Sequence, residues 1–379
     1  TRKIYLFSLY LLKEYVFEYT RTYCIRGRER MKILFHISSL FGGGAERVMS
    51  YLINHNCELN NEVYIVVCYE KEGEYYISPK AKKIVIGSQS IVSQSLELRK
   101  IIKRIKPDIC VGFMQGGNIR LSLACMGLKQ KYILSVRNDP KKEYPNAIMQ
   151  KLVRYWFDAA DGVVFQTEDA KKFFCSSVQN KSSIIYNPVS NQFFRENVSK
   201  DTAGIVAFGR LVDQKNFAML IKAYAMIADR IDDDLYIYGE GPLEKRLYEI
   251  INSTGLAGRI HLMGRTNNVP EVLKTAKVYA LSSDFEGMPN ALLEAVCMLV
   301  PVVSTDCPCG GPKEICSNEC GLLSPVGDVE SFANNLYKVS NSKQLREQLV
   351  KKCIERRNAF SNDSILKKWD AFFDKVCGC

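Results

Sequence analysis

Glu286 and Glu294 are the residues whose type and spacing suggest the most chemistry in this chain of 379 residues. Gly287-Met-Pro-Asn290 directly follows the first acid, and Pro289 has the fixed φ and missing N–H group that suit a first helical turn. We therefore expect a loop at Glu286 and a helix from Asn290 that carries Glu294. Free N–H groups at such a helix start can hold an anionic or hydroxyl-rich ligand. The spacing alone fits equally well a capped helix with two solvated acids.

A glycine-rich run at residues 38–47 is the second candidate, because Gly42, Gly43 and Gly44 let a backbone approach a ligand closely. A helix from Ala45 would offer its N–H groups to an anion. A dinucleotide-binding loop is the rival interpretation, but Arg47 stands where that fingerprint requires Gly or Ala. Three glycines that serve only a tight turn are the plainer alternative.

Two further polar loops follow expected strands, the position where ligand-binding residues gather. Arg210 and Lys215 flank the start of a helix, and two fixed cations suit a pyrophosphate whose charge grows as it leaves. Arg265 lies in a polar loop at residues 263–268 that could meet a planar base edge, or it lies in water. For Glu240, within Tyr238-Gly-Glu-Gly-Pro242, a plain strand-to-helix turn is the better interpretation.

The cysteines and acids give weak support for a metal. The 14 cysteines are scattered as small hydrophobic residues, which favours a reducing compartment over a disulfide framework. Cys307, Cys309, Cys316 and Cys320 form one cluster, but their spacings are poor matches to zinc ligands. Residues 232–234 are three aspartates just before an expected strand, and we interpret them as a solvated turn. We therefore expect no metal and no cofactor.

The charge is uneven along the chain. Residues 1–200 hold 31 Lys and Arg against 18 Asp and Glu, a net charge of +13, whereas residues 201–379 hold 21 against 23, a net charge of −2. A basic first half suggests an anionic partner there. We favour an anionic membrane surface, because no nucleic-acid recognition motif accompanies the charge. A merely solvated basic surface is the alternative.

Residues 1–30 form an N-terminal extension with a short apolar stretch that Lys13, Glu14 and Glu18 interrupt. The stretch is too short to span a bilayer, and no small-residue cleavage site follows it. It fits an interfacial amphipathic helix, or an upstream extension with Met31 as the natural start, which we favour.

From Met31 onward, short apolar runs alternate with helical patterns, which is typical of parallel α/β layering. We expect six strands at residues 32–37, 63–68, 109–113, 132–136, 162–165 and 183–186. After a polar linker, six more are expected at 204–208, 234–238, 260–262, 278–281, 302–304 and 321–323. These give one Rossmann-like domain at 31–187, a linker at 188–203, a second Rossmann-like domain at 204–361 and a C-terminal helix at 362–379. Two such domains leave a cleft between the carboxyl ends of their sheets.

Five motifs in this order resemble the retaining glycosyltransferases of family 4, which have the GT-B fold. The likeness runs from about Met31 to about Leu366 and is more specific in the second half. Phe285-Glu-Gly-Met-Pro-Asn-Ala-Leu-Leu-Glu-Ala295 and Ser135-Val-Arg-Asn-Asp-Pro140 are similar to bacterial enzymes that extend lipid-linked surface polysaccharides. The motifs are Gly42–Gly44, Phe208-Gly-Arg-Leu…Gln-Lys-Asn216, Tyr238–Pro242, the Glu286 and Glu294 pair, and Thr305-Asp-Cys-Pro…Gly-Pro-Lys-Glu314.

The resemblance implies roles for these residues. The two acids and two cations would act on the donor: Arg210 and Lys215 on its diphosphate, Glu286 on the sugar hydroxyls and Glu294 on the ribose. The resemblance also implies that the C-terminal helix packs back on the first domain. Further donor contacts would come from the Gly43 and Gly44 loop, Arg265, Gly287, Met288, Pro289 and Asn290.

Residues 137–138 depart from the family pattern. Many relatives have a His near the donor sugar after the strand that here ends at Val136, whereas this chain has Arg137 and Asn138. Either residue could take the place of that His as a sugar or acceptor contact.

These observations together predict a metal-independent hexosyltransferase. It would move a hexose or N-acetylhexosamine from a nucleotide diphosphate sugar, most simply a UDP-sugar, to a glycan hydroxyl on a polyprenyl-diphosphate-linked acceptor. Retention would follow from attack on the face that the diphosphate leaves; a covalent intermediate on Glu286 is the second mechanism. The expected location is cytoplasmic and peripheral on the membrane. A nucleotide-sugar epimerase and a non-catalytic nucleotide-sugar binding protein are the alternatives.

Overall fold

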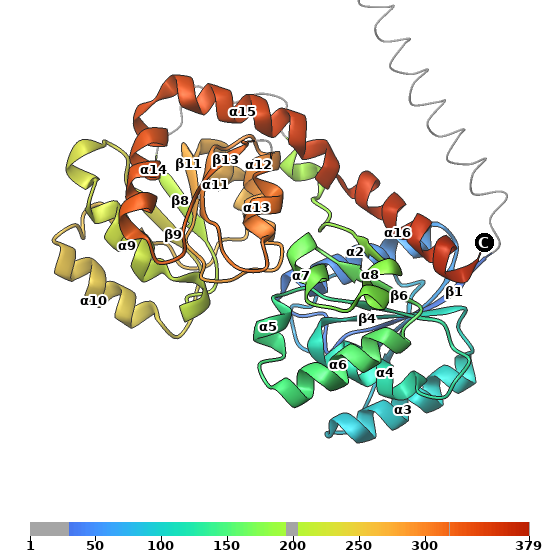
Figure 1. Ribbon diagram of the computed structural model, residues 1–379. Coiled ribbons are helices and arrows are strands. Elements are labelled where there is room, and N and C mark those ends of the chain that lie inside the picture. The colour runs from blue at the N-terminus through green and yellow to red at the C-terminus, as the bar shows by residue number, and fades with distance from the viewer. Residues whose placement is uncertain (1–29, 195–203, 318, 379) are drawn as a thin grey trace, which may run out of the picture.

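The computed structural model describes residues 30–194, 204–317 and 319–378, and Figure 1 shows two α/β units joined near the middle of the chain. The N-terminal extension, apart from Arg30, and most of the polar linker lie outside the described residues. Among the helices of the described ranges, none combines the length and the apolar character that crossing a bilayer requires.

The first domain is a seven-stranded parallel sheet in the order β3-β2-β1-β4-β5-β6-β7. Its order reverses between β1 and β4, so the crevice beyond their carboxyl ends is the topological switch point where open α/β sheets bind ligands. The strands are β1 (Lys32–His36), β2 (Glu62–Val67), β3 (Lys82–Val85), β4 (Ile109–Phe113), β5 (Tyr132–Ser135), β6 (Gly162–Phe165) and β7 (Ser182–Ile184). The helices are α2 (Gly44–Glu58), α3 (Ile91–Ile105), α4 (Met114–Cys125), α5 (Pro140–Glu143), α6 (Ala147–Ala159), α7 (Glu168–Lys172) and α8 (Ser176–Asn180).

The second domain repeats this plan with six parallel strands in the order β10-β9-β8-β11-β12-β13, and its switch point lies between β8 and β11. The strands are β8 (Ile205–Phe208), β9 (Leu235–Tyr238), β10 (Ile260–Leu262), β11 (Val278–Leu281), β12 (Val302–Thr305) and β13 (Gly321–Ser324). The helices are α9 (Phe217–Ala225), α10 (Glu244–Thr254), α11 (Val269–Thr275), α12 (Asn290–Cys297), α13 (Gly311–Ile315), α14 (Val329–Asn341) and α15 (Lys343–Arg357).

The central strands form because their Val, Ile and Leu side chains can be buried on both faces of a parallel sheet. In β4, β5, β6, β8, β11 and β12 every residue is buried. The sequence pattern placed twelve of the strands within two residues of their observed ends. It missed β3, a half-exposed edge strand whose two lysines hide the apolar signal.

Helix α16 (Asn362–Cys377) returns to the first domain and lies along it, as the red helix in Figure 1 shows. Trp369 is fully buried and its ring centroid lies 5.7 Å from that of Phe113 in β4. Gly162 makes room for the helix, because a Cβ there would lie 2.9 Å from the Phe372 ring. This packing confirms the predicted return of the C-terminal helix.

Candidate active site

The loop after β11 carries Glu286 to the switch point of the second sheet. Lys215, from the loop after β8, places its Nζ 2.5 Å from Glu286 Oε1. The Ser283 hydroxyl donates to the same Oε1 at 2.7 Å, and Glu286 is 7% exposed. Both partners bind one carboxylate oxygen, so Oε2 is left for another hydroxyl. Two side chains predicted from separate motifs, Lys215 and Glu286, therefore meet in one cluster, and Ser283 joins them without having been predicted.

Hydrogen bonds between the two loops, from both side chains and backbone, hold this cluster in place. Asn216 adopts the left-handed region with φ 44°, caps α9 with its side-chain oxygen and donates to Asp284 Oδ1 at 2.7 Å. Gln214 donates from Nε2 to the Phe285 carbonyl at 2.9 Å, and its own carbonyl accepts from the Asp284 N–H at 2.9 Å. The loop after β8 is thus fastened to the loop after β11, which fixes Lys215 beside Glu286.

Glu294 lies on α12 and has a different partner. Arg47, on α2 of the first domain, forms an ion pair with Glu294 Oε1 across the two domains. Burial raises the pKa of Glu294, and the charge of Arg47 opposes that rise. No local pattern could predict this pair, because its members are 247 positions apart. The acid predicted to hold a ribose is therefore held by a first-domain cation in this structure.

Contacts between the glycine-rich loop and the start of α12 bring the two domains close together. A Cβ on Gly44 would lie 2.4 Å from Asn290 Nδ2, whereas a Cβ on Gly43 would meet the carboxylate of Glu46. Asn187 adds a second connection that the sequence did not reveal. Its side chain is buried and donates to the Met288 carbonyl at 3.0 Å and to Asn290 Oδ1 at 2.7 Å.

The loop of residues 137–138 also meets the second domain, through its backbone. A Cβ on Gly287 would lie 2.2 Å from the Arg137 carbonyl and 3.0 Å from Asn138 Cα, so only glycine permits this approach. The Arg137 side chain is buried over the Phe113 ring at 4.0 Å and donates to Asn187 Oδ1 at 3.0 Å. Burial lowers its pKa to about 9. In this structure the Arg137 side chain supports the domain contact.

Two predicted donor residues are exposed. Arg210 follows β8 on the cleft side, where its charge acts on Glu46 of the first domain; burial is nevertheless the larger influence and raises the pKa of Glu46. Arg265 lies exposed in the loop after β10. Helix α12 begins at Asn290, as expected. Pro289 caps the helix and does not lie in its first turn, and its carbonyl accepts from the N–H groups of Leu292 and Leu293.

The acids and cysteines that suggested a metal have other partners. Asp233 is buried and pairs with Lys277 at 2.8 Å, so the interpretation of residues 232–234 as a wholly solvated turn was wrong. Asp232 is exposed and Asp234 is half-buried, so burial is confined to Asp233, whose charge Lys277 balances. Within the described residues, no group of three or more His, Cys, Asp or Glu side chains is arranged to hold a metal ion.

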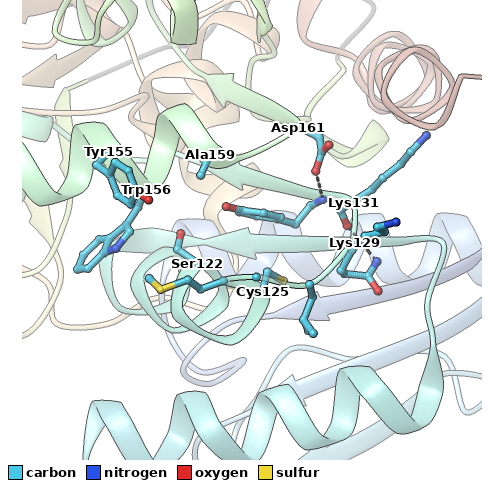
Figure 2. Close-up of a pocket in the computed structure, with 13 residues that line it drawn as sticks. Ser122, Cys125, Lys129, Lys131, Tyr155, Trp156, Ala159 and Asp161 are labelled. Carbon is cyan, nitrogen blue, oxygen red and sulfur yellow. Dashed lines mark hydrogen bonds between the residues drawn. The ribbon is translucent and has the colours of Figure 1, made fainter.

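A cavity of about 400 Å³ lies away from these residues, between α4, α6 and the start of β5. Figure 2 shows Tyr155 and Trp156 on one side of it and Lys129 and Lys131 on the other. Asp161 accepts from the Tyr132 N–H at 2.9 Å at its back. Because Tyr132 begins β5, the cavity opens at the amino edge of the sheet, opposite the edge that carries the candidate site.

The chain is similar in sequence to known glycosyltransferases. Residues 189–356 match the family of glycosyl transferases group 1. The chain is 28% identical over 356 residues to a Campylobacter jejuni α-1,4-N-acetyl-D-galactosaminyltransferase, named for a diNAcBac-PP-undecaprenol acceptor, covering 89% of this chain and 97% of that one. It is 26% identical over 341 residues to the amylovoran biosynthesis glycosyltransferase AmsD of Erwinia amylovora, covering 86% and 95%.

The fold is shared with solved structures. The crystal structure of Anabaena HepE in complex with UDP superposes on this chain with a TM-score of 0.79 at 16% identity. The superposition covers 91% of this chain and 100% of HepE. The two facing Rossmann-like domains therefore form the GT-B fold that the resemblance implied, and the match to the glycosyl transferases group 1 family falls on residues 189–356.

Proposed function

We propose that this protein is a retaining, metal-independent glycosyltransferase that moves a hexose or N-acetylhexosamine from a UDP-sugar to a hydroxyl of a lipid-linked glycan. The observation that carries the proposal is the buried Lys215–Glu286–Ser283 cluster at the switch point of the second sheet. A cation and a hydrogen-bonded acid side by side suit a substrate with a phosphate next to a ring of hydroxyls.

The donor would lie along the edge formed by the loops after β8, β10 and β11. Lys215 and the exposed Arg210 would bind the diphosphate, and the free Oε2 of Glu286 would accept from a sugar hydroxyl. Glu294 would accept from the ribose once Arg47 has released it. The N–H groups from Gly287 to Asn290 would meet the sugar, and Arg265 the base. A UDP donor is supported by the fold shared with HepE, which was solved with UDP.

The chemistry follows from where charge develops. As the bond from the anomeric carbon to the diphosphate breaks, negative charge grows on the phosphate oxygens, and Lys215 and Arg210 would stabilise it in place of a metal. The acceptor hydroxyl would attack from the same face and give its proton to a donor phosphate oxygen, which retains the configuration. Glu286 is engaged by two donors on Oε1, which favours its use as an organiser of hydroxyls over its use as a nucleophile.

A lipid-linked acceptor is supported by the relatives and by the outer face of the first domain. The Campylobacter relative is named for an acceptor on diphospho-undecaprenol. On α6, Ile148, Leu152 and Tyr155 recur at helical spacing and are exposed, with Ile148 71% exposed. Lys151 and Arg154 lie exposed between them. Apolar side chains interleaved with cations fit the surface of an anionic membrane, which we propose as the peripheral location of the enzyme.

The direct test measures transfer with purified variants. Glu286→Gln and Lys215→Ala should each lower kcat by about 100-fold or more, because each removes a group that acts on the reacting end of the donor. Glu249→Gln and Lys222→Ala change exposed residues of the same domain and should keep full activity. Circular dichroism and thermal melting check that the variants are folded. Wild-type activity in either site variant would overturn the site assignment.

The products separate the proposed activity from its alternatives. The wild-type protein is incubated with a UDP-sugar and a diphospholipid-linked glycan, and the products are identified by mass spectrometry and by the anomeric proton in NMR. An α-linked product from an α-linked donor supports retention. An epimerised donor would instead indicate an epimerase, and binding of the donor with no turnover would indicate a non-catalytic binding protein. Unchanged activity in EDTA is expected if Lys215 and Arg210 replace a metal.

A further inference from the structure

The switch point of the first sheet holds a buried cation that the proposed donor chemistry does not use. Arg120 lies on α4, and its side chain reaches back along the helix to the carboxyl end of β1, in the direction that helical side chains take. Its Nε donates to His36 Nε2 at 3.0 Å and its Nη2 donates to the Ser38 hydroxyl at 2.6 Å. The residue is 6% exposed. It therefore occupies the crevice between β1 and β4, the counterpart of the place where Lys215 lies in the second domain.

His36 fixes the direction of this guanidinium. The His36 Nδ1 lies 2.8 Å from the Val66 carbonyl, which can only accept, so Nδ1 carries the proton. Nε2 is then a bare acceptor and takes the N–H of Arg120 Nε. Burial, together with the nearby Arg120 charge, lowers the pKa of His36 to about 3, so the ring stays neutral at working pH. The neutral His36 ring accepts the Arg120 N–H at Nε2. It therefore orients the guanidinium but does not balance its positive charge.

No acid compensates the charge of Arg120. Lys215 pairs with Glu286 and Arg47 pairs with Glu294, but in the part of the chain that the structure describes no carboxylate forms an ion pair with Arg120. Burial lowers its pKa, and the side chains of Cys68 and Tyr69 oppose this effect. A buried charge without a counterion destabilises the folded state, and an anionic ligand would compensate the charge.

The backbone around Arg120 is built for close approach. A Cβ on Gly117 would lie 3.2 Å from the His36 carbonyl, and a Cβ on Gly116 would lie 3.1 Å from Arg120 Nη1. The two glycines let α4 begin directly against the end of β1. No hydrogen bond among the described residues uses Arg120 Nη1. Lys71 is an exposed cation nearby along the chain, and its Nζ lies 5.4 Å from the Phe41 ring centroid and 5.6 Å from that of Tyr69, a residue whose side chain acts on Arg120.

We infer that Arg120, positioned by His36 and Ser38 at the first-domain switch point, binds a phosphate of the acceptor diphosphate. Lys71 supplies a second, exposed cation to the same group. The inference rests on the proposed function, because it takes the acceptor to be a lipid diphosphate. Ser38 begins the loop that ends at Gly44 against Asn290, so this site is joined to the donor side by seven residues of chain.

The donor diphosphate is the competing source of the same chemistry. Lys215 lies beside Glu286 in the second domain, and Arg210 belongs to the same loop, whereas Arg120 lies on the first domain. The two sources are separated by occupying the donor site with UDP before the second ligand is added. Geranyl diphosphate then serves as a short probe for the acceptor headgroup.

Isothermal titration of geranyl diphosphate into UDP-saturated protein tests the inference. Arg120→Met should weaken this binding at least tenfold, since a charge-assisted hydrogen bond is lost. The affinity of the Arg120→Met variant for UDP should equal that of the wild type. Arg104→Met removes an exposed arginine of the same domain and should bind both ligands normally. In steady-state assays, Arg120→Met should raise the KM for the lipid acceptor and leave the KM for the donor unchanged.

Two further variants keep the test decisive if Arg120→Met does not fold. Ser38→Ala removes one positioning bond and should weaken geranyl diphosphate binding by several-fold, and Arg120→Lys should retain part of it. Equal binding of geranyl diphosphate by wild type and variants would overturn the inference, as would weakened UDP binding in Arg120→Met. A failure of the proposed function gives a different result. In that case the protein would transfer no sugar, but its binding of geranyl diphosphate would still depend on Arg120.

Discussion

At the scale of single residues, the two glutamates that looked alike in sequence have different electrostatic partners. Glu286 is held within its own domain by Lys215 and Ser283. Glu294 is held by Arg47 from the other domain. The first acid is therefore held in place without any ligand, whereas the second would have to exchange a partner to take the proposed role at the donor ribose. An exchange of this kind lowers apparent donor affinity by the fraction of molecules in which Arg47 still occupies Glu294.

Glu143, at the end of α5, has a titration that should be visible in stability. Burial raises its pKa to about 7, with the Asp139 charge as a smaller cause, and its Oε2 has no partner among the described residues. The unfolded chain ionises this group near pH 4.5, so the folded state loses stability as pH rises from about 4.5 to 7 and keeps that deficit above it.

Glu143→Gln should therefore raise the free energy of unfolding at pH 8 by about 2 to 3 kcal/mol and have little effect at pH 4.5. Urea denaturation at the two pH values measures the difference. Glu72→Gln, at an exposed position, is the control and should show no such dependence. An equal effect of Glu143→Gln at both pH values would mean that this carboxyl is not the titrating group.

Residue types predicted the members of the candidate site better than their partners. The acids, the cations and the glycine loop follow from local chemistry at strand ends, and the structure places Lys215 beside Glu286 and Gly44 beside Asn290. In the sequence, Arg47 stood out only as a mismatch to a dinucleotide fingerprint, and Asn187 was only the last residue of the first predicted domain. Their roles depend on contacts between the domains, which no local pattern encodes.

At the scale of elements, the sequence pattern succeeded where one face is buried and failed where a helix is polar all round. Helix α3 begins at Ile91, directly after Ser90, which forms a capping box with Ser93. Helix α15 was not predicted, since only Leu349 and Cys353 of its 15 residues are buried. Charged and amide side chains fill most of its other positions, and the apolar Ile354 is exposed, so the hydrophobic periodicity is weak.

Helix α16 should contribute to the stability of the first domain. Trp369 packs on Phe113 and Phe373, and Asp370 pairs with His55 of α2 at 2.9 Å. Trp369→Ala should lower the free energy of unfolding of that domain by about 3 to 5 kcal/mol, the usual result of emptying a large aromatic site. Lys375→Ala, exposed on the same helix, should be close to neutral.

Urea unfolding followed by far-ultraviolet circular dichroism measures the loss, and UDP titration reports separately on the second domain. Because Trp369 belongs to the core of the first domain, its removal should leave UDP affinity within about twofold of the wild type. A stability equal to that of the wild type would contradict the role of α16 in this core.

At the scale of the whole molecule, two sheets meet with the carboxyl edges of their strands facing, and each contributes its switch point. The contacts of Asn187 with Met288 and of Arg47 with Glu294 join the domains at the cleft. The first domain also carries the excess positive charge of the chain and the exposed apolar stripe on α6. The acceptor side and the membrane side would then belong to the same domain, which suits a substrate anchored in lipid.

Membrane binding should depend on that stripe. The double variant Ile148→Ser and Leu152→Ser should reduce affinity for vesicles of phosphatidylglycerol about tenfold, because two apolar side chains no longer enter the interface. Tyr248→Ser, an exposed aromatic on α10 of the second domain, is the matched control. Binding of wild type should weaken in high salt, which screens the lysines and arginines. Co-sedimentation with vesicles measures both effects, and unchanged binding by the double variant would exclude α6 as the contact.

The return of α16 to the first domain also sets an order on biosynthesis. A ribosome completes the first sheet long before it reaches Asn362, and at about 5 to 20 residues per second the interval is on the order of ten seconds. During that time the apolar patch around Phe113 has no cover, and the whole second domain is made and can fold. The first domain to be translated is thus the last to be finished, and a nascent chain of this protein is a natural client for chaperones.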